Sequence, residues 1–458
     1  MRKILAALLA LFVLSTAVLA AGHTATTKKQ TDIHITETTV RGDPSAAEGL
    51  ELQITANYDR YLYWQTSYAA GAGPTCETDF RFYNSRQNRS RGMTETLDIQ
   101  TASLNYGIGG NGIDLEEWEN NQEVGRQTMM LKPAIDTASR TSASETRTEL
   151  LNLRDYYDLF KVQIEVHLSG AIKRDDSWKS AIASYFRFPV PEDLQVSVTV
   201  TKDEAGNITD VNVEEVKGED IYQAYASGVM LQDVFYFVMV NSGEPGLDFS
   251  LIPEYGIWAL PLHREKENGI TTVTYGDLQL VHALDRETAA AQRLTASADG
   301  TRLHLITKEN GQLYLYILDT QTLMQQNRIA LDCEEVPTIW EAENLLVLNY
   351  DNHDLQAQKD VIQVLEKQGE EYEPWPELPL YPYVDGYWYG EPVLSYDGRR
   401  LAVAVLHDHW LTGSVRLAVY TKEGTAYVGD YHYSGDDIGR DLGTNEEHRL
   451  AARWYREG

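Results

Sequence analysis

The chain has 458 residues, a formal net charge of −30 and 43% hydrophobic residues, with 69 Asp and Glu against 39 Lys and Arg. This composition is typical of a globular protein and excludes wholesale disorder. The excess of carboxylates repels phosphates and anionic lipid headgroups, which argues against nucleic acid as a partner.

The first residues have the three parts of a secretory signal. Arg2 and Lys3 precede an apolar run over residues 4–18, and small residues follow at Ala20 and Ala21. We predict a signal peptide over residues 1–20, cleaved after Ala20, and a secreted or extracytoplasmic protein. No later segment approaches the roughly 18 uninterrupted apolar residues of a membrane span. After cleavage we therefore expect a soluble monomer without a membrane span.

The residues after the signal contain many short strand patterns. Residues 33–40, within an N-terminal segment over 21–48, alternate between apolar and polar side chains and predict one strand. In the region 49–225, strand patterns cover residues 50–55, 61–64, 80–83, 160–166, 194–200 and 208–213. The first three runs predict one four-stranded unit and the last three predict another, with a weakly defined unit between residues 95 and 145.

Two short motifs in this region have more than one interpretation. The run Gly107-Ile-Gly109-Gly110-Asn111-Gly112 has the glycine spacing of a dinucleotide-binding loop. The acidic residues that follow would repel a pyrophosphate, so we predict a flexible turn and no cofactor. Arg41-Gly42-Asp43 spells an adhesion tripeptide, but it opens a polar stretch before a proline and also predicts a turn.

The region 226–435 repeats one order of strands and turns. Its clearest copies contain the turns Ser297-Ala298-Asp299-Gly300 and Ser395-Tyr396-Asp397-Gly398, and each turn is preceded by one strand pattern and followed by three more. A middle copy begins near Glu341 without the motif. Residues 234–240, 255–260 and 278–283 predict a looser fourth copy. A four-stranded unit of about 40 to 50 residues is typical of a propeller blade.

The Ser-x-Asp-Gly turns resemble those of bacterial WD40-like and TolB-like β-propeller repeat proteins. The resemblance implies a fold and carries no catalytic residue. We predict an all-β protein, a β-propeller of seven four-stranded blades with long loops. The strand at 33–40 is expected to close the ring on the last blade, and residues 436–458 are expected to form a polar tail.

Blade topology places several polar and aromatic loops on one face. The loop between the second and third strands of a blade emerges on the same face as the connection to the next blade. The residues predicted to meet there are Asp351, His353, Asp354, Tyr387, Trp388, His407, Asp408 and His409. Aromatic rings beside carboxylates suit sugar or peptide recognition, imidazoles with carboxylates suit a divalent metal such as zinc, and aromatic clusters also fill gaps between blades.

Aromatic clusters in loops usually pack against one another; as the functional interpretation of these residues we predict ligand binding, with no metal assigned to the site. The predicted function is an exported binding or interaction protein for a glycan, a peptide or another protein outside the cytoplasm. No nucleophile with a local base is visible, so an enzyme is the alternative: a hydrolase or lyase acting on glycans with carboxylates from several blades. Two cysteines, Cys76 and Cys333, are too few for a disulfide scaffold. The sequence leaves one alternative, a single long-range disulfide between them.

Overall fold

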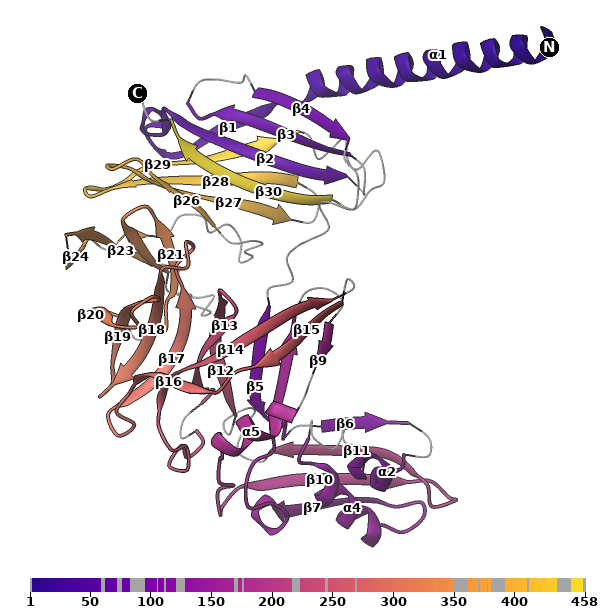
Figure 1. Cartoon of the computed structure of the whole chain (residues 1–458), viewed down its shortest axis with the longest axis vertical. Helices are drawn as coiled ribbons and strands as arrows, with labels where there is room; N and C mark the ends of the chain where they lie inside the picture. The colour runs from indigo at the N-terminus through magenta and orange to yellow at the C-terminus, as the bar shows by residue number, and fades with distance from the viewer. Residues whose placement is uncertain are drawn as a thin grey trace. The chain divides into compact units, whose positions relative to one another are not determined.

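The computed structural model (Figure 1) consists mainly of antiparallel strands in two compact units. One unit contains residues 1–90 and 337–458, and the other contains residues 91–336. The structure describes residues 2–58, 62–71, 76–82, 95–104, 106–110, 113–120, 128–168, 172–174, 177–215, 223–243, 246–267, 270–333, 335–349, 361–369, 371–376, 378–379, 392–409, 412–434 and 446–455. The domain boundaries expected from the sequence stay predictions.

Three sheets follow one another in the last third of the chain, and each contains four consecutive strands in chain order. The first has β17 (Ala289–Ala296), β18 (Arg302–Glu309), β19 (Gln312–Asp319) and β20 (Gln325–Leu331). The second has β21 (Thr338–Ala342), β22 (Leu345–Asn349), β23 (Val361–Gln368) and β24 (Glu371–Pro374), with β25 (Leu378–Pro379) beside β23. The third has β26 (Val393–Tyr396), β27 (Leu401–His409), β28 (Thr412–Thr421) and β29 (Gly424–Tyr433). The predicted equivalence of β18, β22 and β27 as second strands is confirmed.

The two Asp-Gly turns predicted from the sequence join the first two strands of their sheets. Asp299 accepts hydrogen bonds from the Thr301 amide at 3.0 Å and the Ser297 hydroxyl at 2.7 Å, which lower its pKa to about 2. Asp397 accepts from the amides of Arg399 and Arg400 at 2.8 and 2.7 Å. The glycine after each aspartate has a positive φ, 68° and 97°, a conformation that side chains with a Cβ disfavour.

The middle sheet turns without this motif. Its turn lies at Glu343 and Asn344, and Glu343 itself has a φ of 53°. The Asn344 amide donates to the Lys367 carbonyl at 3.4 Å. In this turn Asn344 makes a hydrogen bond to the third strand, whereas in the other two turns an aspartate accepts hydrogen bonds from the turn itself.

A larger sheet precedes these three. Its centre is a meander of β12 (Ala224–Leu231), β13 (Val234–Asn241), β14 (Gly256–Glu267) and β16 (Gln279–Ala283), which confirms the looser fourth copy. Four further strands extend this sheet: β5 (Thr96–Thr101), β8 (Val162–His167), β15 (Ile270–Tyr275) and β9 (Ile172–Arg174).

The strands predicted to form one unit over 160–213 lie in two different sheets, so that prediction is wrong. β8 pairs with β5 in the larger sheet. The other two strands belong to a sheet ordered β6 (Tyr106–Gly109), β11 (Ile208–Glu215), β10 (Gln195–Lys202) and β7 (Thr146–Asn152). The turn expected over 107–112 is wrong in part, because Gly107 and Gly109 belong to β6 and pair with β11; residues 111–112 lie outside the described residues.

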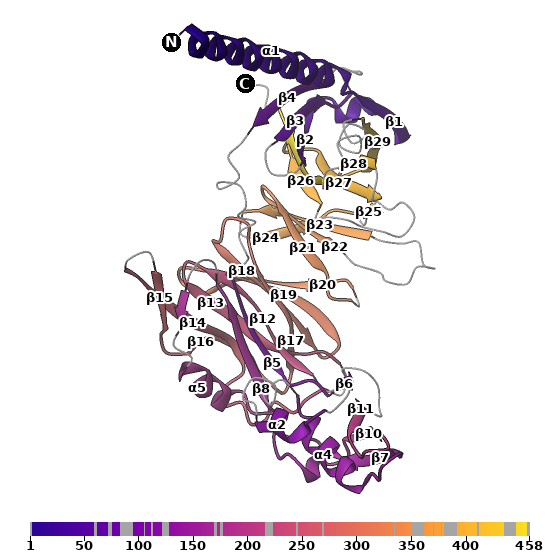
Figure 2. The ribbon, with the colours of Figure 1, turned by 90° about the vertical axis from the view of Figure 1, so that its right-hand side faces the viewer.

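Helices that the sequence analysis did not predict cover this last sheet. Figure 2 shows α2 (Leu115–Asn120) and α4 (Leu131–Arg140) beside its strands. Val196, Val198 and Val200 of β10 are fully buried on one side of the sheet, where α4 packs. Strand alternation identified β10 correctly, but it does not say whether a helix or another sheet covers the apolar face. The structure also describes η2 (Leu153–Asp155) and α5 (Ser177–Tyr185) in this unit.

The other unit joins strands from the two ends of the chain. β1 (Ile35–Gly42) pairs with β29, which confirms that the N-terminal strand is an outer strand of the last sheet. β30 (Glu446–Trp454), which lies in the predicted tail, pairs with β2 (Leu50–Tyr58). β3 (Leu62–Ala69) and β4 (Cys76–Phe82) complete that sheet, and η1 (Pro44–Ala47) follows β1. The count of seven blades and the closure of a ring stay predictions.

Residues 2–32 form a helix, α1 (Arg2–Asp32), whose apolar side chains Leu11, Phe12 and Leu14 are exposed. Among the described residues, no helix has the length and apolarity that crossing a membrane requires. Signal cleavage and export stay predictions.

The Glu37 carboxylate joins three strands where the two terminal sheets meet. It accepts hydrogen bonds from the hydroxyls of Tyr68 on β3 at 2.8 Å and Tyr427 on β29 at 2.7 Å. Tyr431 donates to the Tyr427 oxygen at 3.2 Å and packs edge-on against Tyr68. All three rings are at most 1% exposed, and burial raises the pKa of each hydroxyl, so they stay neutral donors. This cluster fixes β1 to both sheets.

Replacing Glu37 with alanine should lower the free energy of unfolding by about 2 to 4 kcal/mol, because two buried hydroxyls lose a charged acceptor. Urea unfolding followed by circular dichroism measures the change. Thr38→Ala, on the exposed side of the same strand, should change stability by no more than about 0.5 kcal/mol. Equal unfolding midpoints for the two variants would show that the cluster does not fix β1.

A second buried carboxylate joins the last two sheets of this unit. Glu366 on β23 is 8% exposed and accepts from the Trp375 indole and the Tyr396 hydroxyl, both at 3.2 Å. The Lys422 ammonium lies 2.5 Å from Oε2, the carboxylate oxygen that also accepts from the indole. Burial raises the pKa of Glu366, but the hydrogen bonds from Lys422, Trp375 and Tyr396 outweigh burial and hold the pKa below its ordinary value.

A depressed folded-state pKa gives a defined pH dependence. The Glu366 contacts stabilise the fold above the unfolded pKa of about 4.3, and this contribution is lost as the pH falls through the lower folded pKa. Glu366→Gln should therefore lower the melting temperature at pH 7 by about 2 to 4 °C, and the difference from wild type should shrink towards pH 3. Glu371→Gln, an exposed change on β24, should match wild type at every pH. A difference that stays constant from pH 7 to pH 3 would contradict this assignment.

Candidate functional site

Most of the site predicted from the sequence lies outside the described residues. These are Asp351, His353, Asp354, Tyr387 and Trp388. Whether they gather into one ligand-binding surface therefore stays a prediction.

The remaining three predicted site residues lie on a strand. His407, Asp408 and His409 end β27 and pair with residues 412–414 of β28. The prediction that they form a loop is wrong, because strand pairing continues to His409. The Asp397-Gly398 turn precedes β27 and His407 lies near the strand's other end, as expected for this blade. In the described part of the chain, no group of three or more His, Cys, Asp or Glu residues is placed to hold a metal ion.

The two cysteines fall in different compact units. Both are thiols in the structure, and Cys76 donates to the Ile33 carbonyl at 3.3 Å. Burial raises the pKa of the Cys76 thiol, which disfavours the reactive thiolate. The bridge between Cys76 and Cys333 stays a prediction.

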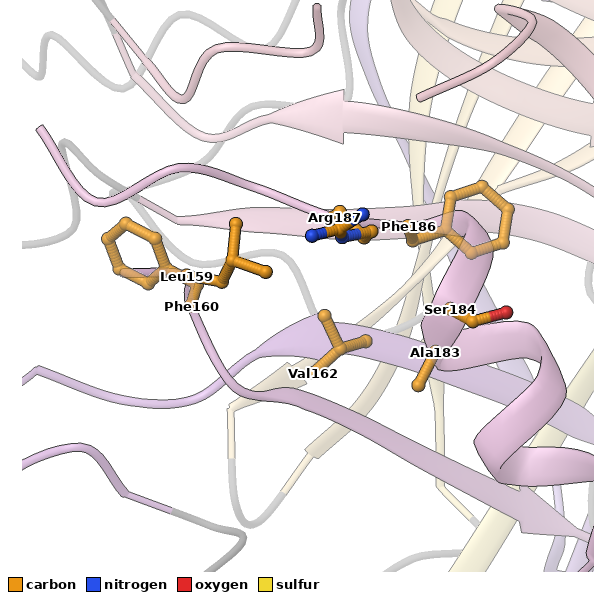
Figure 3. A pocket seen from close by; sticks show the side chains of 7 residues that line it. All are labelled: Leu159, Phe160, Val162, Ala183, Ser184, Phe186 and Arg187. Atoms are coloured by element: carbon orange, nitrogen blue, oxygen red, sulfur yellow. The ribbon is translucent and has the colours of Figure 1, made fainter. Parts of the chain in front are cut away.

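The structure offers a different candidate site, a pocket between α5 and the start of β8. We call it the α5 pocket. Its volume is about 320 Å³, which is at the lower end of the usual range for small-molecule sites. It is lined by Leu159, Phe160, Val162, Ala183, Ser184, Phe186 and Arg187 (Figure 3). All seven residues belong to the unit over 91–336.

Two chain segments form the walls of the pocket, and backbone hydrogen bonds hold them together. The Phe160 amide donates to the Phe188 carbonyl at 2.8 Å, and the Val190 amide donates to the Asp158 carbonyl at 3.1 Å. Leu159 lies between these bonds, where it forms an antiparallel bridge with Pro189. The walls are therefore fixed before any ligand arrives, which reduces the entropy lost on binding.

Buried aromatic rings anchor the pocket to the larger sheet. Phe186 follows the last turn of α5 and is fully buried. Its ring packs edge-on against Phe237 of β13 and Trp258 of β14, with centroid distances of 5.7 and 5.9 Å. Phe188 is also fully buried. Burial alternates along this segment: Phe186 and Phe188 are buried, whereas Arg187 between them is exposed.

The polar groups of the pocket differ in how they are used. The Ser184 hydroxyl donates to the Ala181 carbonyl at 2.6 Å and points away from the pocket in Figure 3. Arg187 lies across the pocket from Val162. Its side chain is exposed, and among the described residues no hydrogen bond or ion pair engages it.

Three other pockets in this unit differ in one respect: their cationic side chain already binds backbone carbonyls. In the pocket beside α2 and α4, about 430 Å³, Lys202 donates to the Ala138 carbonyl. In a pocket of about 450 Å³, Arg154 donates to the Asp158 and Val190 carbonyls. In one of about 270 Å³, Arg286 donates to the Ser250 and Ile252 carbonyls. The α5 pocket therefore offers a ligand the cation that these pockets do not.

The sequence analysis missed the α5 pocket because its residues come from irregular segments rather than from the repeated strands. A usable signal was present: Trp178, Ile182 and Phe186 are spaced by four residues, as on one face of a helix. The alternation of Phe186, Arg187 and Phe188 then sends a lone arginine to the surface beside that helix. Neither pattern belongs to a blade.

Comparison with known proteins found similar solved structures but no family. Neither a protein-family model nor a curated protein matches the sequence. One similar solved structure is a candidate 6-phosphogluconolactonase from Bacteroides fragilis, 10% identical, covering 85% of this chain and 95% of that chain with a TM-score of 0.31.

Two others are propeller domains. That of the trilobed protease from Pyrococcus furiosus is 12% identical and covers 51% of this chain and 68% of its own, with a TM-score of 0.22. That of Cps50 (Swd1) from Myceliophteria thermophila is 11% identical and covers 53% and 93%, also with a TM-score of 0.22. Because these scores are low, the fold assignment depends on the strand order of the repeated sheets. By that order the chain is a propeller-like repeat protein.

Proposed function

We propose that this chain is an exported binding or interaction protein that holds an apolar group of its ligand in the α5 pocket. The observation that carries the proposal is the lining of the pocket: fixed apolar side chains with one available cation. None of the seven lining residues supplies a carboxylate, an imidazole or a thiol for proton transfer or nucleophilic attack at neutral pH. This lining suits binding rather than catalysis.

The proposed ligand lies outside the cytoplasm and is a glycan, a peptide or another protein with an apolar group. Export is supported by Arg2 and Lys3 before the apolar run over 4–18. N-terminal sequencing of the protein recovered from the medium or the periplasm tests it, with Ala21 expected as the first residue. We include a ring of blades closed by the N-terminal strand in this proposal, and the pairing of β1 with β29 supports it.

A pocket-filling variant tests the proposed site. Ala183→Phe should weaken binding of a neutral apolar probe, N-phenyl-1-naphthylamine, by about tenfold or more, because the new ring occupies the space that the probe needs. Fluorescence titration of the probe measures the affinity. Ala181→Phe is the matched control, since Ala181 is exposed on the same helix and does not line the pocket.

Circular dichroism and thermal melting should show both variants folded. Absence of saturable probe binding to the wild type, or an equal loss in the two variants, would overturn the assignment of the α5 pocket as a binding site.

A further inference from the structure

We infer that the ligand of the α5 pocket carries a single carboxylate beside its apolar group, and that Arg187 binds this carboxylate. The inference rests on the proposed function and adds the chemical class of the ligand. The same chemistry is present in a small carboxylic acid with an aromatic or branched side chain and at the C-terminus of a peptide that ends in an apolar residue.

The first argument is the charge balance of the chain. With 69 acidic against 39 basic residues, carboxylates to pair with an arginine are abundant. Arg264 pairs with Glu95 and Asp233, Arg328 with Glu309, Arg416 with Asp430, and Arg140 with Asp136 and Glu149. Arg187 pairs with no described carboxylate. A guanidinium left available in so acidic a protein is a ready partner for an external anion.

The second argument is where this guanidinium lies. Arg187 and Val162 lie on opposite sides of the pocket, with Leu159 at one end and Ala183 beside Val162 (Figure 3). A ligand whose apolar group lies against these three aliphatic side chains would present an adjoining carboxylate to the guanidinium. Its planar fork binds two carboxylate oxygens at once, and the apolar walls reduce the screening of the attraction by water.

The third argument concerns the charge of the ligand. The pocket supplies one cation, and its only other polar side chain, Ser184, already donates to the helix backbone. The net charge of −30 repels a doubly charged anion such as a phosphate monoester more strongly than a monovalent one. A monovalent carboxylate matches a site with one guanidinium.

The experiment compares acids with their neutral amides as competitors of the neutral probe at low ionic strength. The first pair is 3-phenylpropanoate and 3-phenylpropanamide, and the second is the peptide N-acetyl-Gly-Phe with a free or an amidated C-terminus. We expect the wild type to bind at least one acid about fivefold or more tightly than its amide, with a preference that decreases as salt is added. The pair with the larger preference identifies the source of the carboxylate.

Two variants test whether Arg187 causes the preference for the acid over the amide. Arg187→Gln should abolish the acid-over-amide preference, with competition by each acid and amide measured against the variant's own affinity for the probe. Lys179→Gln, which removes one positive charge from α5 outside the pocket lining, should keep the preference. Because Arg187 is exposed, its replacement should leave the melting temperature within about 1 °C of wild type.

The outcomes separate this inference from the proposed function. If the probe binds and amides compete as well as acids, or if Arg187→Gln keeps the preference, the carboxylate inference is wrong and the binding site stands. If the probe binds and neither acids nor amides displace it, the inference is also wrong. If the probe itself does not bind, both fail.

Discussion

The unit that contains both chain ends depends on one carboxylate held by buried hydroxyls. Glu37 comes from the N-terminal strand, and the tyrosines that bind it come from the first sheet and from the last one. Without this contact β1 would be an edge strand held by its pairing with β29 and by the burial of Ile35. Arg400 adds a second connection, because it donates to the Ala46 and Glu48 carbonyls and stacks on Trp454 of β30. Polar contacts therefore act together with strand pairing to join the two ends of the chain.

The α5 pocket arises from the parts of the chain that interrupt the repeated strands. β8 joins the larger sheet, the following residues include α5, and the extended segment after α5 returns beside β8. The sheets supply a rigid base through Phe237 and Trp258, whereas the interruption supplies the lining and the arginine. In many β proteins the sheets likewise provide stability, and the segments that connect them contain the binding residues.

The sequence predicted the features that depend on local pattern. The turns at Asp299 and Asp397, the equivalent second strands and the outer position of β1 follow from alternation and turn chemistry within a few residues. Partners distant in sequence could not be predicted: β8 and β10 have similar alternation, yet one joins a sheet of strands and the other is covered by a helix. β30 was missed because its residues, Arg449 to Trp454 among them, read as a polar tail. Arg187 was missed because the pairing state of one charged side chain is a property of its three-dimensional surroundings.

The pairing of β2 with β30 has a consequence for the order of folding during synthesis. The first sheet lacks an edge partner until residues 446–454 have left the ribosome, whereas the described strands of residues 91–336 find their partners within that span. The unit of residues 91–336 can therefore form first. The unit that joins residues 1–90 with 337–458 depends on contacts of very long sequence separation, which are slow to form. In the interval β2 presents unsatisfied backbone groups, the kind of edge that templates aggregation. A chaperone that shields this strand would thus act on the nascent chain rather than on the finished protein.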